Sequence, residues 1–199
     1  MTHTVRAAAV ILGALAILGG ITGCPFMPSN DDGGGHVVVE PDFKARTSPE
    51  NLLYNLQKAY ELRNIAEYES LLAQDFEFVL SEEDQDDPGM PDTWGRQVEI
   101  GVHTHMFDAD LVNELDLEFV AGNRFWDTVI APNMWSIIIS NVKLRLNGRT
   151  PDAPDVVQDL EVKNASSQFW FRENPWTQEG TSNKIWTIVR WEDKGTTLP

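Results

Sequence analysis

Residues that could transfer protons or hold a metal gather in one predicted helix, residues 94–108. His103 and His105 both lie on it, but residues two apart on a helix diverge, so the pair does not form a shared metal site. His103 is flanked by Ile100 and Phe107, and an imidazole in such apolar surroundings can line a cavity and act as a general base. Packing in the core or exposure at the surface is the alternative for His103.

Aromatic side chains supply the other candidates. Tyr60 and Tyr68 lie on two predicted helices, where a tyrosine packs its ring and keeps a polar tip. Tryptophans can line an apolar cavity, but core packing and contacts between two copies explain them equally well, because interfaces and ligand pockets are both rich in aromatic residues. The predicted pocket consists of Tyr60, Tyr68, Trp94, His103, Trp135, Trp170 and Trp186.

An acidic segment at residues 81–93 invites a calcium site. Its spacing does not match an EF-hand loop, because Pro88 occupies a ligand position in the run from Asp84 to Gly89 and no glutamate closes the loop at the required distance. We therefore expect a solvated acidic loop. No metal site and no cofactor are predicted.

Length and charge limit the classes of protein. A chain of 199 residues suits one domain with appendages, and we expect that domain at residues 47–199. The formal net charge of −16 argues against nucleic acid and anionic lipid headgroups as partners.

Residues 1–23 have the pattern of an export signal, in which Arg6 precedes an apolar run from Ala7 to Leu18. This run is shorter than the about 20 residues that cross a bilayer, and no other stretch reaches that length, so no integral membrane domain is predicted. Ile-Thr-Gly-Cys at residues 21–24 resembles the lipobox of bacterial lipoproteins, which implies cleavage between Gly23 and Cys24 and lipidation of Cys24. An uncleaved anchor helix is the alternative.

Residues 24–46 are predicted to be the lipidated cysteine and a flexible tether, because they are rich in glycine and polar residues. Val37 to Val39 could instead form an edge strand. Cys24 is the only cysteine, so no internal disulfide can form. We expect membrane contact through the lipid anchor only. Cys24 is followed by Pro25 rather than by an aspartate, and in this the chain is similar to lipoproteins that are sorted to the outer membrane. The resemblance implies a protein of the cell envelope that is anchored in the outer membrane and faces the periplasm.

The elements that must position these residues begin with two short helices within residues 48–75. Thr47 or Ser48 can cap the first helix, Pro49 suits its first turn, and Asn64 fits the turn that ends it. From Phe76 the apolar period changes from helical to alternating, so we expect the second helix to end near residues 74–75 and a strand to follow.

The remainder of the chain is predicted to be an antiparallel sheet. Apolar residues alternate over residues 114–119 and again over 184–192. In two long strands the apolar phase slips, once at Ser140-Asn141 and once around Asn164. A β-bulge at each slip would restore the phase and bend the sheet. The sequence therefore predicts an α+β fold with early helices and a strongly curved sheet.

This order of elements resembles the nuclear transport factor 2-like superfamily, which includes ketosteroid isomerase and polyketide cyclases. The resemblance is carried by residues 56–60, the helix-to-strand junction at 68–78 and the closing strand at 185–191. It implies a cone-shaped α+β fold in which three N-terminal helices pack on the curved sheet. In ketosteroid isomerase-like members a carboxylate base follows the first strand, where this chain has Leu80 and Ser81, so no catalytic residue is carried over.

Two functions remain open. The first is a non-catalytic, membrane-tethered domain that binds a small apolar ligand or a protein partner. The second is a lyase, isomerase or hydrolase of the polyketide cyclase type, with His103 or a nearby acid as the base. A homodimer through the convex sheet face is compatible with both.

Overall fold

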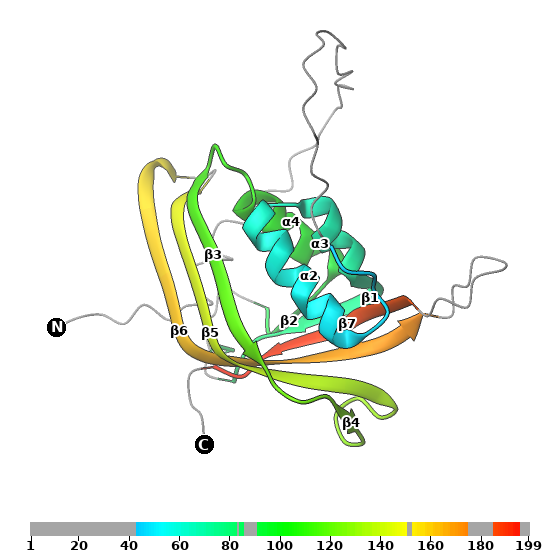
Figure 1. Cartoon of the computed structure of the whole chain (residues 1–199). Helices are drawn as coiled ribbons and strands as arrows, with labels where there is room; N and C mark the ends of the chain where they lie inside the picture. The colour runs from blue at the N-terminus through cyan, green and yellow to red at the C-terminus, as the bar shows by residue number, and fades with distance from the viewer. Residues whose placement is uncertain (1–42, 83, 86–90, 151–152, 175–184, 196–199) are drawn as a thin grey trace, which may run out of the picture.

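Three helices pack on one side of a strongly curved seven-stranded sheet (Figure 1). The computed structural model describes residues 43–82, 84–85, 91–150, 153–174 and 185–195. The elements are α2 (Pro49–Leu62), α3 (Ile65–Leu71), β1 (Leu72–Val79), β2 (Thr93–Gly95), α4 (Arg96–Met106), β3 (Val112–Ala121), β4 (Phe125–Asp127), β5 (Met134–Thr150), β6 (Ala153–Asn174) and β7 (Ile185–Asp193). The predicted α+β class is confirmed.

The first helix begins where the sequence predicts. The Ser48 side chain accepts a hydrogen bond from the Asn51 amide, and Pro49 occupies the first turn of α2. The prediction for Asn64 is wrong, because Arg63 adopts the left-handed conformation that ends α2, with φ of 51°. Asn64 instead caps α3, where its side-chain oxygen accepts from the Glu67 amide.

The predicted end of the second helix is also wrong, since α3 stops at Leu71 and β1 begins at Leu72. Leu72 packs in the core under the helices, whereas Ala73 packs on the other face of the sheet. Adjacent apolar residues on opposite faces are typical of a strand covered on both sides. The sequence alone cannot separate that pattern from the last turn of a helix.

The third helix is shorter than predicted and presents a different face. Trp94 belongs to strand β2, where it pairs with Phe78, and α4 starts only at Arg96. Val98, which shares the four-residue spacing of Trp94, Val102 and Met106 in the sequence, is exposed. The buried face consists of Glu99, Val102, His103 and Met106.

The sheet order is β2-β1-β7-β6-β5-β3, and β4 pairs with β5. All these pairs are antiparallel except β1 with β7, which is parallel, so the prediction of a purely antiparallel sheet is wrong. Strands β1 and β7 come from opposite ends of the domain, and no hairpin turn fixes their direction. Sequence patterns report which face a strand buries and leave its neighbour undetermined.

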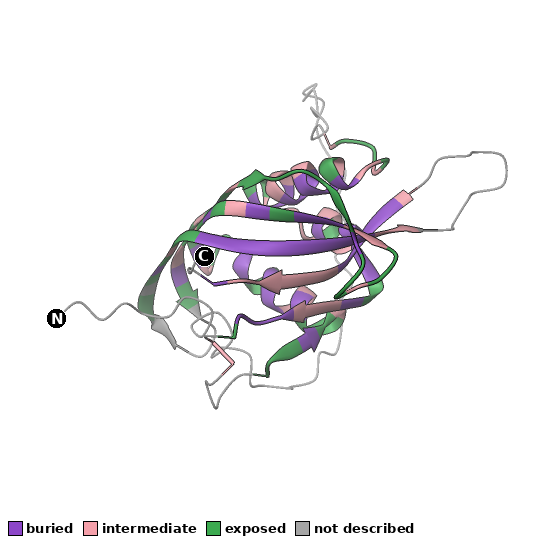
Figure 2. Cartoon of the chain, turned by 90° about the horizontal axis from the view of Figure 1, so that it is seen from below, coloured by how far each residue is buried: buried purple, intermediate pink, exposed green. Residues whose placement is uncertain are grey.

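Both predicted bulges are confirmed. The pairing of β5 with β6 shifts on either side of the Val142–Ala165 pair, and Asn141 and Asn164 have φ of 52° and 57°. Asparagine tolerates this left-handed conformation better than most residues. The bulges keep the apolar side chains of both long strands directed toward the helices, where they join one core. Figure 2 shows the buried positions along the central strands.

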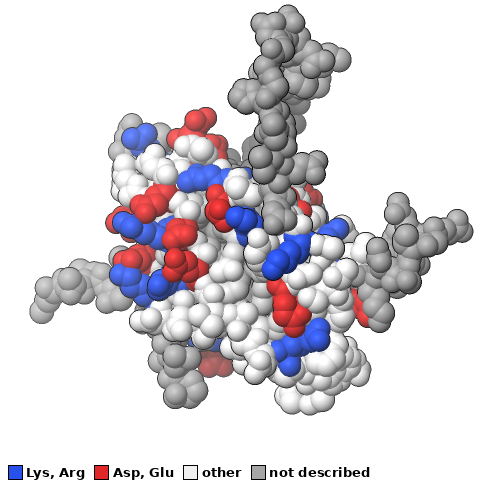
Figure 3. Space-filling model, in the orientation of Figure 1, with Lys and Arg blue, Asp and Glu red and all other residues white. Residues whose placement is uncertain are grey.

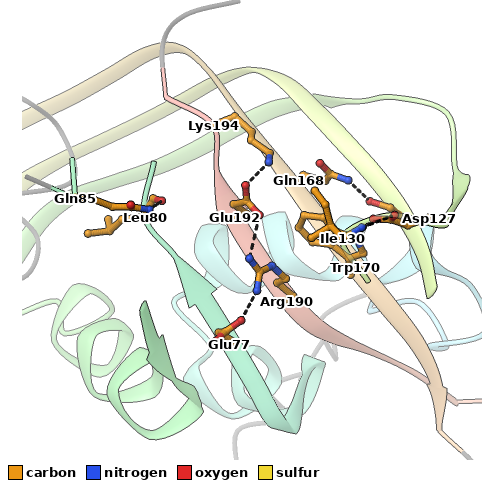
Figure 4. Close-up of polar contacts among 11 residues, drawn as sticks. Glu77, Leu80, Gln85, Asp127, Ile130, Gln168, Trp170, Arg190, Glu192 and Lys194 are labelled. Carbon is orange, nitrogen blue, oxygen red and sulfur yellow. Dashed lines mark hydrogen bonds and ion pairs between the residues drawn. The ribbon is translucent and has the colours of Figure 1, made fainter. Parts of the chain in front are cut away.

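The outer face of the sheet carries a smaller packed region around Trp170 (Figure 4). Asp127 accepts hydrogen bonds from the Trp170 indole and from the amides of Val129 and Ile130. Arg190 lies over the Trp170 ring, with 5.5 Å between the guanidinium carbon and the ring centroid. The segment after β4 therefore folds back over this face of the sheet.

Predictions for residues 1–42 lie outside the described residues. These comprise the export signal, Cys24 and most of the tether. Within the described segments, no helix has both the length and the apolar character needed to cross a membrane.

Candidate functional site

Five polar or aromatic side chains from four elements meet in the interior. We call Tyr60, Tyr68, Trp94, Glu99 and His103 the buried polar cluster. Tyr60 comes from α2, Tyr68 from α3, Trp94 from β2, and the other two from α4. Each is at most 9% exposed. Four of the seven predicted pocket residues therefore come together, joined by Glu99.

Helix α4 places Glu99 and His103 on one face, since residues four apart on a helix are neighbours. The His103 ring stacks on Tyr68, with ring centroids 4.0 Å apart and planes inclined by 17°. Phe107 packs edge-on against His103, Tyr60 and Tyr68. Aromatic packing on several sides therefore fixes the position of the imidazole.

Glu99 is the centre of the hydrogen bonding. The Tyr68 hydroxyl donates to one carboxylate oxygen and the Trp94 indole N–H donates to the other, each over 2.6 Å. Hydrogen bonds to a carboxylate are stronger than those between neutral groups. A buried carboxylate needs such partners, because an unpaired charge in the interior is strongly unfavourable.

The contacts of His103 indicate its tautomer. Nδ1 lies 2.9 Å from the Glu99 carbonyl oxygen, which can only accept, so Nδ1 carries the proton in the neutral ring. Nε2 then offers a lone pair to the Tyr60 hydroxyl, 2.5 Å away. The Tyr60 hydroxyl is therefore the donor in this contact.

Burial sets the protonation states of these groups. It raises the pKa of the Tyr60 and Tyr68 hydroxyls well above their usual value, and the Glu99 carboxylate adds to both shifts. Burial lowers the pKa of His103 below 6.5, although Glu99 opposes this shift. Both phenols are thus protonated and the imidazole is neutral at pH 7.

The hydrogen-bond donors of the buried polar cluster are paired with acceptors inside the cluster. The hydroxyls of Tyr60 and Tyr68, the Trp94 indole and His103 Nδ1 all donate to acceptors within it. Stabilising an oxyanion, as in acyl transfer or enolisation, requires a donor directed at the substrate. This arrangement leaves no donor of the cluster free for a substrate, so acyl transfer or enolisation would require the cluster to rearrange.

An aromatic cluster adjoins these residues on the helix side of the sheet. Phe78 stacks on Trp94 with centroids 4.2 Å apart and lies 5.3 Å from the Trp191 ring, which in turn packs on Phe169. The Trp191 indole nitrogen is buried and has no hydrogen-bond partner among the described residues. Few buried polar groups in native proteins lack a partner, and each such group calls for an explanation.

The other predicted residues lie elsewhere. Trp186 packs in the core under the helices. Trp135 lies at the edge of that core, where it contacts Trp126 and the Arg124 guanidinium. Trp170 lies on the opposite, outer face of the sheet, so it does not share a site with the buried polar cluster.

The second histidine lies apart from the buried polar cluster. His105 is exposed, with Nδ1 beside the Gly101 carbonyl oxygen. Among the described residues, no three side chains of His, Cys, Asp or Glu are grouped so that they could hold a metal. Part of the acidic segment, residues 83 and 86–90, lies outside the described residues.

Sequence reasoning missed Glu99 and Trp191. A signal for Glu99 was present, because it precedes Val102, His103 and Met106 by three, four and seven residues, the spacing of one helix face. A lone glutamate on such a face, four residues before a histidine, indicates a buried pair. Trp191 has no comparable signal, since the closing strand is apolar on both faces.

No family model and no curated protein sequence matches the chain. Solved structures similar to it include a conserved protein from Planctomyces limnophilus (14% identity, covering 72% of this chain and 89% of that one, TM-score 0.48). ActVI-ORFA from Streptomyces coelicolor is 11% identical, with 73% and 92% covered and a TM-score of 0.49. A nuclear transport factor 2-like protein from Cytophaga hutchinsonii is 12% identical, with 73% and 93% covered and a TM-score of 0.38. These are distant likenesses of fold. The three helices and the curved sheet of this chain have the arrangement that the sequence analysis predicts.

Proposed function

We propose that this protein is a membrane-tethered, non-catalytic lipoprotein of the cell envelope whose domain binds a small apolar ligand. The observation that carries the proposal is the buried, unpartnered Trp191 N–H within the aromatic cluster of Phe78, Trp94 and Phe169. Such a site suits an apolar molecule with a single hydrogen-bond acceptor, because the rings supply contact area and the N–H fixes orientation. A protein partner that inserts an apolar side chain into this site is the alternative to a small ligand.

The buried polar cluster supports a non-catalytic role. Its donors are paired internally, and the raised pKa of both tyrosines keeps them neutral, so neither acts as a nucleophile at pH 7. The cluster instead ties α2, α3 and β2 to α4. It therefore holds the helices in a fixed position over the sheet.

Native mass spectrometry of the full chain, before and after exposure to a lipid extract of the source cells, tests ligand binding. We expect a retained small molecule on the wild type and a lower retained fraction on Trp191→Phe, which removes the N–H and keeps an aromatic ring. Val157→Ala, at an exposed valine of β6, is the control and should bind like the wild type. Repeated extracts that leave no bound mass on a folded wild type would overturn the ligand proposal.

The anchor is tested separately. Wild-type protein made in a lipoprotein-processing bacterium should enter the detergent phase of a phase separation and carry acyl chains on Cys24. Cys24→Ser should remain unprocessed and lose the acyl mass. Two or more acyl chains give stable membrane attachment, whereas a single chain binds marginally. The inferred location, the outer membrane facing the periplasm, is checked by fractionation of the two membranes.

A second candidate, catalysis of the polyketide cyclase type, is favoured by one observation. His103 is neutral and fixed, and its Nε2 contacts the Tyr60 hydroxyl, so a proton could pass between them if the cluster opened toward a substrate. The retained ligand distinguishes the two functions. An enzyme would alter it on incubation and His103→Gln would abolish that change, whereas a binding protein releases it unaltered.

A further inference from the structure

The hairpin formed by β4 and the start of β5 exposes apolar side chains on a part of the molecule that projects from the body (Figure 1). We call residues 124–134 the apolar hairpin. Its exposed apolar residues range from Phe125 at 38% to Val129 at 85%, with Trp126 and Ile130 near half. Exposed groups of this kind, close together, mark interaction sites.

The apolar hairpin differs from the rest of the chain in charge. Between Ala121 and Ser140 the only ionisable residues are Arg124 and Asp127, in a protein with 31 acidic residues. Asp127 is buried and bound to the Trp170 indole, so the hairpin presents no exposed carboxylate. In Figure 3 the end of the molecule that carries the hairpin is largely uncharged. Its surface therefore avoids the repulsion that the acidic domain would meet at a membrane.

The apolar side chains of the hairpin lie on both of its faces. Trp126 pairs across the strands with Trp135 on the helix side, while Phe125 pairs with Ser136 on the outer side. A flat protein interface would cover one face and leave the other exposed. The outer face also packs on Trp170 through Asp127 and Met134, but Phe125 and Trp126 leave apolar area exposed on both faces. Exposed apolar area that includes a tryptophan fits the interfacial region of a bilayer, where tryptophan is favoured.

The start of the domain lies beside the hairpin. Glu50, in the first turn of α2, forms an ion pair with Arg124 at 3.6 Å. The described chain begins at Phe43, and the next residue, Lys44, exchanges hydrogen bonds with Asn55 further along α2. A flexible chain of about 20 residues, as the sequence predicts between Cys24 and Phe43, has a typical span of about 25 Å. A lipid anchor at Cys24 would thus keep the hairpin within reach of the bilayer surface and raise its effective concentration there.

We propose that the apolar hairpin is a second membrane contact, which inserts Phe125, Trp126, Val129 and Ile130 into the interface of the bilayer that holds the anchor. This inference rests on the proposed anchoring at Cys24, and it replaces the expectation that the membrane is contacted through the lipid anchor only. The hairpin alone would bind weakly, and tethering makes a weak contact sufficient. Insertion of the apolar hairpin would fix the orientation of the domain relative to the membrane.

The test uses the full acylated chain in phosphatidylcholine vesicles. With Cys24 acylated, Thr128→Cys provides a single free thiol at the hairpin tip for an environment-sensitive NBD label. Ala109→Cys, exposed between α4 and β3, is the matched control. We expect a blue shift and at least a twofold rise in NBD emission at position 128, with quenching by lipid-borne quenchers, and neither at 109. A free Cys24 thiol would identify failure of the anchor itself.

Val129→Asp should abolish the emission change at position 128 while the acylated protein remains on vesicles. Because Val129 is 85% exposed, this substitution leaves the fold intact, and Val157→Asp, at another exposed valine, should have no effect. A label at 128 that stays in water on vesicle-bound protein would overturn the proposal. An emission change that needs no vesicles and grows with protein concentration would also overturn it, and would assign the hairpin to contact with a second copy.

Discussion

Replacing Glu99 by glutamine should destabilise the protein strongly although the two side chains have the same shape. The carboxylate accepts from Tyr68 through one oxygen and from Trp94 through the other, and both bonds measure 2.6 Å. Glutamine has one accepting oxygen, and its amide N–H2 would face the second donor. One of the two donors therefore loses its partner in the interior.

The expected magnitude follows from these contacts. A hydrogen bond to a charged group contributes about 1.5–3 kcal/mol, and a buried donor left unpaired costs about 1–3 kcal/mol. The neutral amide is easier to bury than a carboxylate, which offsets part of the sum. We expect a loss of about 2–4 kcal/mol in the free energy of unfolding. For a domain of about 150 residues this corresponds to a fall in Tm on the order of 10 °C.

Urea denaturation followed by tryptophan fluorescence and circular dichroism measures the loss. Glu118→Gln is the matched control, because Glu118 pairs with Lys143 at the surface and its removal should cost less than about 1 kcal/mol. A double-mutant cycle of Glu99→Gln with Tyr68→Phe should give a coupling energy above about 0.5 kcal/mol. If Glu99→Gln costs no more than Glu118→Gln, the carboxylate does not organise the cluster and the reasoning is refuted.

Two further predictions concern His103 and two glycines. The pKa of His103 is lower in the folded chain than its unfolded value near 6.5, so the unfolded chain binds more protons at this residue as pH falls. The contribution of His103 to the free energy of unfolding is therefore full above about pH 6.5 and declines as pH falls toward the folded pKa. His103→Gln should remove that part of the pH dependence in urea titrations from pH 7.5 to 5, and an unchanged slope would contradict the assignment. Gly101→Ala should stabilise by about 0.5–1 kcal/mol, because the position is helical and open, whereas Gly148→Ala should destabilise, because its Cβ would lie 2.8 Å from the Leu111 carbonyl oxygen. Thermal melts compare the two, and equal Tm shifts would contradict the close packing of Gly148 against Leu111.

The features predicted correctly from the sequence, such as the start of α2 and the two bulges, depend on interactions between residues close together in the chain. Ser48 and Pro49 mark the start of α2 because capping depends on neighbouring residues in the chain. The slips of apolar phase at Asn141 and Asn164 predict bulges because strand alternation has a fixed period of two. The fold class follows from the order of these segments.

The candidate site was predictable only in part. Tyr60, Tyr68, Trp94 and His103 are recognised by their types, but Glu99, which joins them, is not among the residues that the sequence analysis predicts. Trp135, Trp170 and Trp186 were grouped with them by type alone, and the structure distributes them over the core, its edge and the outer face.

The sequence by itself determined the caps, the bulges and the succession of helices and strands, because each depends on residues close together in the chain. Only the tertiary structure decided that β1 and β7 run parallel, that Trp94 belongs to a strand, and that Glu99 is buried among two tyrosines and an indole. Those outcomes depend on partners from other elements. A carboxylate is stable in the interior only when the donors that satisfy it arrive from elsewhere in the chain.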